Sequence, residues 1–163
     1  MHLAERDRDP SHERTADGPT EEGPALRDAS TLAERAADDE AQAADARERF
    51  RIGPLPQIDA DEAIRAQLGP DERVHALRTR AILKAPGGDG TLGYGGTLYL
   101  TSSRLVHLGQ MVVSVRLTDI VEASLAGERL LLTLRQAEGL SLDVDRPRLL
   151  RAEMAEAGRR LRE

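Results

Sequence analysis

The stretch that most constrains this chain runs from residue 95 to residue 109 and reads GGTLYLTSSRLVHLG. Within it, Leu98 and Leu100 alternate with other side chains, and after a Thr-Ser-Ser interruption Leu105 and His107 alternate in the same way. A period of two places successive side chains on opposite faces, which is typical of a half-buried strand. Two such strands joined by a short polar corner predict a β-hairpin. The segments that follow repeat this pattern until one final helix.

The same alternation predicts strands on both sides of the hairpin. Before it, residues 73–83 place Leu77, Ala81 and Leu83 on one face and basic side chains on the other. After it, strands are expected at residues 110–117, 119–125, 129–135 and 140–144. Residues 85–96 hold six of the chain's 14 glycines and a proline, which predicts a long, mobile hairpin connection.

The last segment changes to a helical period. An apolar stripe at positions i, i+4, i+7 and i+11 is formed by Leu150, Met154, Ala157 and Leu161. Asp145 is placed to cap the N-terminus of this helix, and Pro147 is tolerated in its first turn. A helix with one apolar stripe that follows a run of antiparallel strands is expected to cover the open end of a bent sheet or small barrel.

Composition excludes several classes of protein. Cysteine is absent, so neither a disulfide framework nor a thiolate metal site is available. No stretch approaches the roughly 20 apolar residues of a membrane span. The N-terminus, MHLAERDRDP, has no apolar core, so no secretory signal is expected and a cytoplasmic location is predicted. Aromatic residues make up 2% of the chain, which removes most stacking platforms for single-stranded nucleic acid.

Charge divides the chain into two parts. Residues 1–50 carry 14 acids and 7 arginines, a net charge of −7, and residues 51–163 carry 15 acids and 16 basic residues, a net charge of +1. These values sum to the overall −6. A nearly neutral domain with an acidic arm lacks the basic field that nucleic-acid binding needs, so no nucleic-acid partner is expected.

The arm itself is expected to have two parts. Residues 1–25 carry few large apolar side chains, which predicts disorder. Residues 30–50 are rich in Ala, Glu and Arg, and Thr31 and Glu34 have the spacing of a capping box, so a helix is expected. The apolar face of that helix is mostly alanine, which favours a solvated or fraying helix over one that docks a partner. A proline-containing linker and a short helix follow, at residues 53–56 and 59–68.

The order of about seven short strands and one C-terminal amphipathic helix resembles the pleckstrin-homology-like superfamily, and within it the bacterial PH and GRAM-type domains. The likeness is carried by the motifs DERV at 71–74, GTLYLT at 96–101, SRL at 103–105 and VRLTDI at 115–120. In the last motif Arg116 stands where the family often has proline or a polar residue. The resemblance covers roughly residues 70–162.

The resemblance implies a mainly β, PH-like fold. Its bent antiparallel sheet or split barrel would have about seven strands and be closed by the C-terminal amphipathic helix, after a disordered to helical N-terminal arm. The expected division is an acidic arm at residues 1–52, a linker and short helix at 53–69, and the PH-like domain at 70–163.

No catalytic constellation emerges from the sequence. Ser102 and Ser103 lack the setting of a nucleophile elbow, and the glycine-rich stretches lack the Gly-Lys-Ser/Thr of a P-loop. Asp143 and Asp145 are better explained by the start of a helix than by acid–base chemistry. Four histidines stand without metal-ligand spacing, namely His2, His12, His75 and His107. Those on strands, His75 and His107, are expected to be structural, and neither a metal nor a cofactor is predicted.

One basic group could bind a ligand. Arg78, Arg80 and Lys84 are expected on one face of the first strand, beside the glycine-rich connection. In PH domains that bind phosphoinositides, this strand and loop supply the bases that hold phosphate through charge-assisted hydrogen bonds. The connection itself adds no further base and carries Asp89, so a solvated strand face is the competing interpretation.

The sequence therefore predicts a non-catalytic binding module or adaptor. It would dock an unknown protein partner against a strand edge or groove. The alternative is binding to an anionic membrane surface through the basic first-strand face, in which case the cytoplasmic protein would be peripheral at the membrane.

Overall fold

The computed structural model describes residues 24–85 and 93–163, so most of the expected disordered tail and of the expected hairpin connection lies outside it. Within these residues, seven strands form one antiparallel sheet in the order β4-β3-β2-β1-β7-β6-β5. The strands are β1 (Val74–Lys84), β2 (Tyr94–Thr101), β3 (Arg104–Gly109), β4 (Val112–Arg116), β5 (Ile120–Ala126), β6 (Arg129–Leu134) and β7 (Leu140–Asp143). The helices are α1 (Pro24–Ile52), α2 (Glu62–Arg65), the 3-10 turn η1 (Leu117–Asp119) and α3 (Pro147–Arg160).

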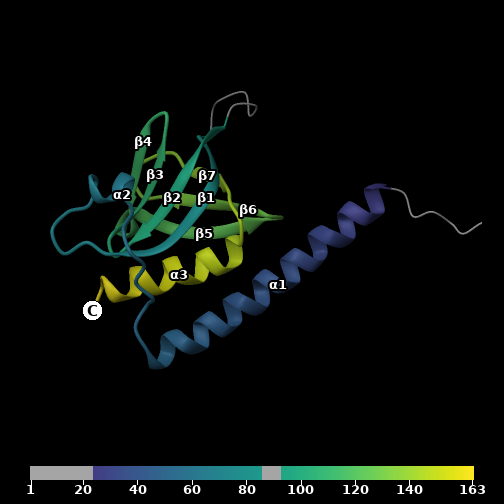
Figure 1. The fold of residues 1–163 in the computed structure, drawn as a ribbon, viewed down its shortest axis with the longest axis horizontal. Coiled ribbons are helices and arrows are strands. Elements are labelled where there is room, and N and C mark those ends of the chain that lie inside the picture. Colours follow the sequence, from purple (N-terminus) through teal and green to yellow (C-terminus); the bar gives the residue numbers. More distant parts are fainter. Residues whose placement is uncertain (1–23, 86–92) are drawn as a thin grey trace, which may run out of the picture.

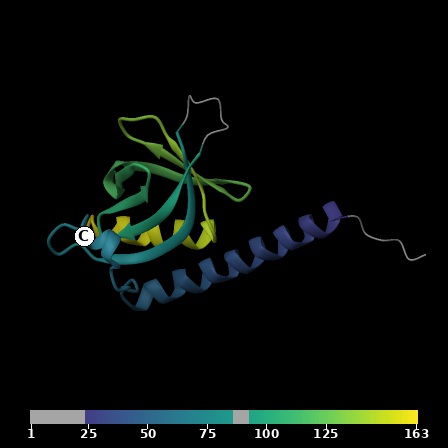
Figure 2. The ribbon, with the colours of Figure 1, turned by 45° about the horizontal axis from the view of Figure 1, so that its top comes forward.

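The predicted hairpin is confirmed. β2 and β3 pair antiparallel, with Leu98 opposite His107 and Leu100 opposite Leu105. The other expected strands also form, and the sheet bends over α3 without closing, because β4 and β5 lie at opposite ends of the strand order. Figures 1 and 2 show α3 lying between the sheet and α1. The fold is therefore the mainly β, PH-like arrangement that the sequence predicts.

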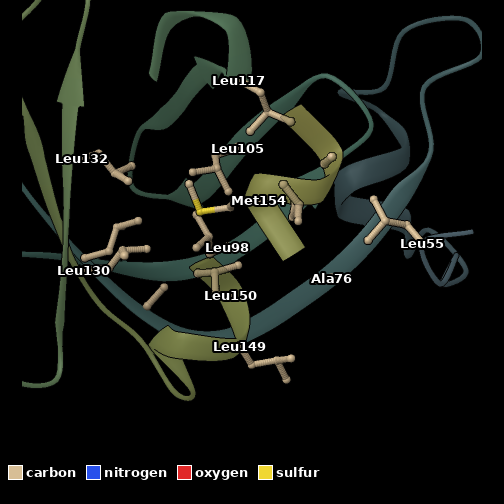
Figure 3. Packing of buried hydrophobic residues seen from close by; sticks show 14 of the residues in the cluster. Leu55, Ala76, Leu98, Leu105, Leu117, Leu130, Leu132, Leu149, Leu150 and Met154 are labelled. Atoms are coloured by element: carbon tan, nitrogen blue, oxygen red, sulfur yellow. The ribbon is translucent and has the colours of Figure 1, made fainter. Parts of the chain in front are cut away.

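The main core fills the concave side of the sheet with leucine (Figure 3). Leu98, Leu105 and Leu130 from the strands meet Leu150 and Met154 from α3. Burying each leucine contributes about 1.5–3 kcal/mol, so this cluster holds α3 against the sheet. The predicted apolar stripe of α3 is confirmed except at its last member. Leu161 is 42% exposed because α3 ends at Arg160.

A second core lies on the outer face of the sheet. Ile64 of α2 packs there with Val74, Tyr99 and Val106. α2 is shorter than the helix expected at residues 59–68. Its N-cap, Asp61, accepts a 3.0 Å hydrogen bond from the backbone N–H of Ile64 and a 2.6 Å bond from the Tyr99 hydroxyl. The predicted linker region is thus packed onto the strands.

α1 is docked on α3 over only part of its length. Ala43, Ala46 and Phe50 are buried, whereas the exposed or half-exposed residues 28–38 extend past α3 (Figure 1). The expectation of a solvated helix at residues 30–50 therefore holds for residues 30–38 and is wrong for residues 39–50. The reason is that small alanine side chains let two helices approach closely, so an alanine face can bury well where a partner helix is available.

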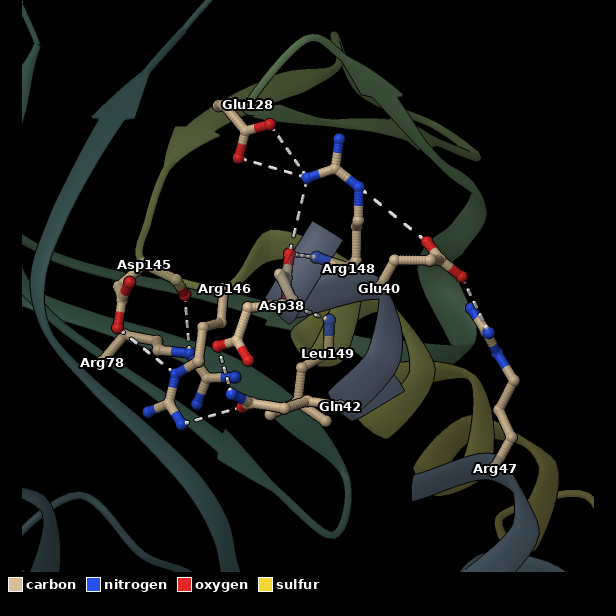
Figure 4. A network of polar contacts seen from close by, with 11 residues as sticks. Asp38, Glu40, Gln42, Arg47, Arg78, Glu128, Asp145, Arg146, Arg148 and Leu149 are labelled. Carbon is tan, nitrogen blue, oxygen red and sulfur yellow. Dashed lines mark hydrogen bonds and ion pairs between the residues drawn. The ribbon is translucent and has the colours of Figure 1, made fainter. Parts of the chain in front are cut away.

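The start of α3 is capped by α1. Asp39, which is 2% exposed, accepts backbone hydrogen bonds from Arg148 (2.8 Å) and Leu149 (3.0 Å). The Arg148 side chain also bonds Glu128 at 2.9 Å and lies 3.8 Å from Glu40 (Figure 4). These contacts join α1, α3 and the β5–β6 turn.

The prediction that Asp145 caps the N-terminus of α3 is wrong. The N-cap position is held by Arg146 in a left-handed conformation (φ 50°), without a side-chain cap of its own. The Asp145 carboxylate consequently lies outside the first turn, with 77% of the side chain exposed, and pairs with Arg146. The first turn of α3 is capped by a residue that precedes it by more than 100 positions in the chain.

Glu72 organises the entry to β1. Its carboxylate forms a two-point ion pair with Arg104 at 2.8 and 3.1 Å, and accepts hydrogen bonds from the hydroxyls of Thr101 (2.6 Å) and Ser103 (3.1 Å) and from the backbone N–H of Gly69 (2.8 Å). Burial alone would raise the pKa of Glu72. The hydrogen bonds, that from Arg104 foremost, outweigh burial and lower the pKa from an ordinary 4.5 to about 2.

The low pKa of Glu72 makes stability depend on pH. The folded-state pKa lies below the unfolded one, so the stabilisation is complete above pH 4.5 and is lost as pH falls towards about 2. The span from 4.5 to about 2 corresponds to about 3 kcal/mol. Urea unfolding of the wild type and Glu72→Gln across this range tests it. The difference between their free energies of unfolding should shrink as pH falls, and a constant difference would contradict the prediction.

Candidate functional site

A groove with a volume of about 460 Å³ runs between β5 and α3. Figure 1 shows β5 alongside α3, with α1 on the far side of that helix. Its lining includes Val121 and Glu122 from β5, Arg47 from α1, and Arg151, Ala155, Gly158 and Arg162 along α3 and the turn after it. Three elements far apart in the sequence therefore share this site.

One wall of the groove is a strand edge. Among the described residues, β5 pairs only with β6, so its second edge has no strand partner. A register shift between Ile120 and Glu122 marks a bulge in this strand. Val121, within the bulge, is 59% exposed. An unpaired edge presents backbone N–H and C=O groups that a further strand could bond.

The opposite wall is lined by small side chains. The side chains of Met154 and Leu117 close the bottom of the groove towards the main core. Ala155 is exposed, and a Cβ added at Gly158 would meet only the Arg162 side chain, 3.7 Å away. α3 consequently leaves room beside β5 for side chains from another molecule.

The groove is basic although the whole chain is acidic. Its lining holds three arginines, Arg47, Arg151 and Arg162, and one acid, Glu122. Arg47 pairs with Glu40 at 3.3 Å. The side chains of Arg151 and Arg162 make no hydrogen bond or ion pair with any other described residue. The site could therefore hold anionic groups without first breaking an internal pair at these two positions.

The three residues singled out in the sequence do not share a face. Arg78 lies opposite Leu98 and Ala81 lies opposite Gly96, so β1 has one more residue than β2 across this interval. Such a bulge reverses which side chains face inward. The prediction of one basic face is therefore wrong for Arg78, which is 6% exposed on the concave side, whereas Arg80 is exposed.

Arg78 and Lys84 also pair with different carboxylates. Arg78 forms a 3.0 Å ion pair with Glu153 of α3 and donates from Nε to the Asp145 carbonyl at 2.9 Å. The pKa of Glu153 is raised, because its burial outweighs the opposing effect of Arg78. Lys84 lies 3.3 Å from Asp143, and Arg129 on β6 bonds the same carboxylate at 2.8 Å. Binding of an anion by Arg78, Arg80 and Lys84 remains a prediction. These three side chains do not form the cluster on one strand face that such binding requires.

The strand histidines are structural, as predicted. His75 Nδ1 lies 2.7 Å from the carbonyl of Pro56, and His107 Nε2 lies 3.0 Å from that of Ala81. The His107 ring passes over Gly96, where an added Cβ would come within 2.9 Å of it. In the part of the chain that the structure describes, no three His, Asp or Glu side chains are grouped to hold a metal ion.

The groove was missed in the sequence, although part of its signal was present. Arg151, Ala155, Gly158 and Arg162 follow the same i, i+4, i+7, i+11 spacing as the apolar stripe, one position further on. A second stripe of two arginines around two small residues could have been noticed. This stripe faces an unpaired strand edge because of the order of the strands in the sheet. The sequence pattern does not reveal that order.

Among known proteins, only solved structures show a similarity to this chain. No family model matches the chain, and no curated protein matches it. The Vps36 N-terminal PH domain has 18% identity and a TM-score of 0.49, over 59% of this chain and 86% of that one. The PH domain of USP37 has 17% identity and a TM-score of 0.40, over 52% and 96%. The C-terminal domain of an unknown protein from Leishmania infantum has 14% identity and a TM-score of 0.42, over 53% and 84%.

Two of these neighbours are PH domains. None of the described helices is long and apolar enough to cross a membrane.

Proposed function

We propose that this chain is a non-catalytic docking module that takes an extended segment of a partner protein along β5. The observation that carries the proposal is the unpaired edge of β5 beside a groove. An extended segment could continue the sheet through backbone hydrogen bonds, which supply affinity for any sequence. Its alternate side chains would enter the space beside Ala155 and Gly158, which supplies selectivity.

The chemistry of the groove favours binding over catalysis. Its lining holds arginines, apolar side chains and the single carboxylate of Glu122, without a histidine or a hydroxyl beside it. General acid–base or nucleophilic catalysis needs a pair of such groups within hydrogen-bond reach. Binding to an anionic membrane surface is the less favoured function, because Arg78 and Lys84 of the first strand are engaged with carboxylates.

Filling the groove should abolish docking. Ala155 is exposed and lines the groove, so Ala155→Trp adds a bulky indole at its wall while costing the helix only about 0.5 kcal/mol. A library of random peptides would be selected on the full chain, and the affinities of enriched peptides measured by fluorescence anisotropy. We expect Ala155→Trp to weaken these peptides about tenfold or more and to leave the melting temperature nearly unchanged.

Two controls make this test specific. Ala44→Trp adds the same side chain to an exposed position of α1 outside the groove and should leave affinity unchanged. Amide hydrogen exchange should slow in β5 when a peptide binds. Peptides that bind Ala155→Trp as well as the wild type would overturn the proposal. Salt-dependent sedimentation with anionic vesicles, lost in Arg80→Ala/Lys84→Ala and kept in Ala155→Trp, would instead establish lipid binding.

A further inference from the structure

We infer that the segment taken by the groove is acidic, with carboxylates that pair with Arg151 and Arg162. This inference rests on the proposed function, because it specifies the occupant of the same groove. The groove lining carries three arginines and one acid, Glu122, in a chain whose net charge is −6. A concentration of positive charge on an acidic protein is a local feature that attracts anions at short range.

The pairing of the neighbouring arginines singles out these two. Arg159 and Arg160 both bond Glu156, and Arg148 bonds Glu128. Within residues 24–85 and 93–163, Arg151 and Arg162 have no carboxylate of their own. The arginines of α3 and of the turn after it therefore have carboxylate partners within the protein, except for the two that line the groove, and a partner's carboxylates would pair with those two.

The spacing of the two arginines sets the spacing of the acids. Arg151 lies in α3 and Arg162 lies two residues past the end of that helix at Arg160, so nine helical steps of about 1.5 Å and a short turn separate them by roughly 15 Å. An extended segment rises about 3.3 Å per residue, so carboxylates about four residues apart would reach both arginines on flexible side chains. Residues four apart in a strand also lie on one face, which would turn both acids towards α3. Between them, a small or apolar residue would lie over Ala155 and Gly158.

The probe is a short peptide of alternating valine and serine with two glutamates four residues apart. Matched peptides carry two glutamines at the same positions, or two adjacent glutamates. Anisotropy on the full chain at low and physiological salt would compare the wild type with Arg151→Gln, Arg162→Gln and the double variant. Arg80→Gln is the matched control, since it removes one exposed positive charge outside the groove.

We expect the spaced acidic peptide to bind most tightly and to lose about fivefold in affinity with each groove arginine, the size expected of one surface ion pair. Arg80→Gln should have no effect. Equal binding of the glutamine peptide, an equal loss in Arg80→Gln, or no binding of the acidic peptide would overturn the inference. The proposed function fails separately, if selected peptides ignore Ala155→Trp.

Discussion

Replacing Arg78 with alanine is expected to lower the free energy of unfolding by about 3–5 kcal/mol, the cost of leaving one member of a buried ion pair alone. The Arg78 guanidinium, with 5% of the side chain exposed, faces Glu153, with 15% exposed. Removing it would leave that carboxylate without its partner and the Asp145 carbonyl without its donor. The raised pKa of Glu153 shows that burial already disfavours its charge in the wild type.

Urea unfolding at neutral pH measures this effect against two other variants. Arg80→Ala, two residues away and exposed, should change the free energy of unfolding by no more than about 0.5 kcal/mol. The double variant Arg78→Met/Glu153→Leu should recover most of the loss, because apolar side chains of similar volume need no partner. If Arg78→Ala unfolded like Arg80→Ala, Arg78 would have to be a solvated residue, the competing interpretation of the first-strand face.

The contrast between Arg78 and the β2–β3 hairpin shows what the sequence could predict. Period-two alternation holds wherever a strand is regular, and it correctly predicts that Leu98, Leu100 and Leu105 are buried. In β1 the alternation is broken by a bulge, and a bulge carries no fixed residue type. On the C-terminal side of the bulge, Ala81 and Leu83 are buried as predicted. On its N-terminal side, Arg78 is buried although the pattern predicts that it lies on the basic face.

The hydrophobic periodicity of the sequence does not predict which distant elements pack against each other. An alanine-rich helix is equally compatible with solvent and with a close helix partner, and only the position of α3 decides between them. The groove likewise cannot be predicted from local periodicity, because Arg47, Val121 and Arg151 become neighbours only through the strand order and the docking of α1. Local periodicity therefore predicted the elements, while the candidate site arises from how they assemble.

Replacing Asp39 with alanine should lower the free energy of unfolding by about 2–4 kcal/mol. The Asp39 carboxylate accepts the backbone N–H groups of Arg148 and Leu149 at the positive end of α3 and lies 3.6 Å from the Arg148 guanidinium. The expected loss combines that of a helix cap with that of leaving a buried N–H group unsatisfied. It should appear in urea unfolding, together with faster amide exchange in the first turn of α3.

The neighbouring residue provides the control for this cap. Asp38 has the same charge and lies one residue earlier in α1, but it is exposed and, among the residues that the structure describes, its carboxylate bonds only Gln42, so Asp38→Ala should cost less than about 0.5 kcal/mol. Asp39→Asn should be intermediate, because an amide keeps one acceptor oxygen and loses the charge that the helix end favours. A small, equal effect of Asp38→Ala and Asp39→Ala would mean that α1 does not cap α3. A loss confined to Asp39 would make α1 an integral part of the domain, because the first turn of α3 would depend on it.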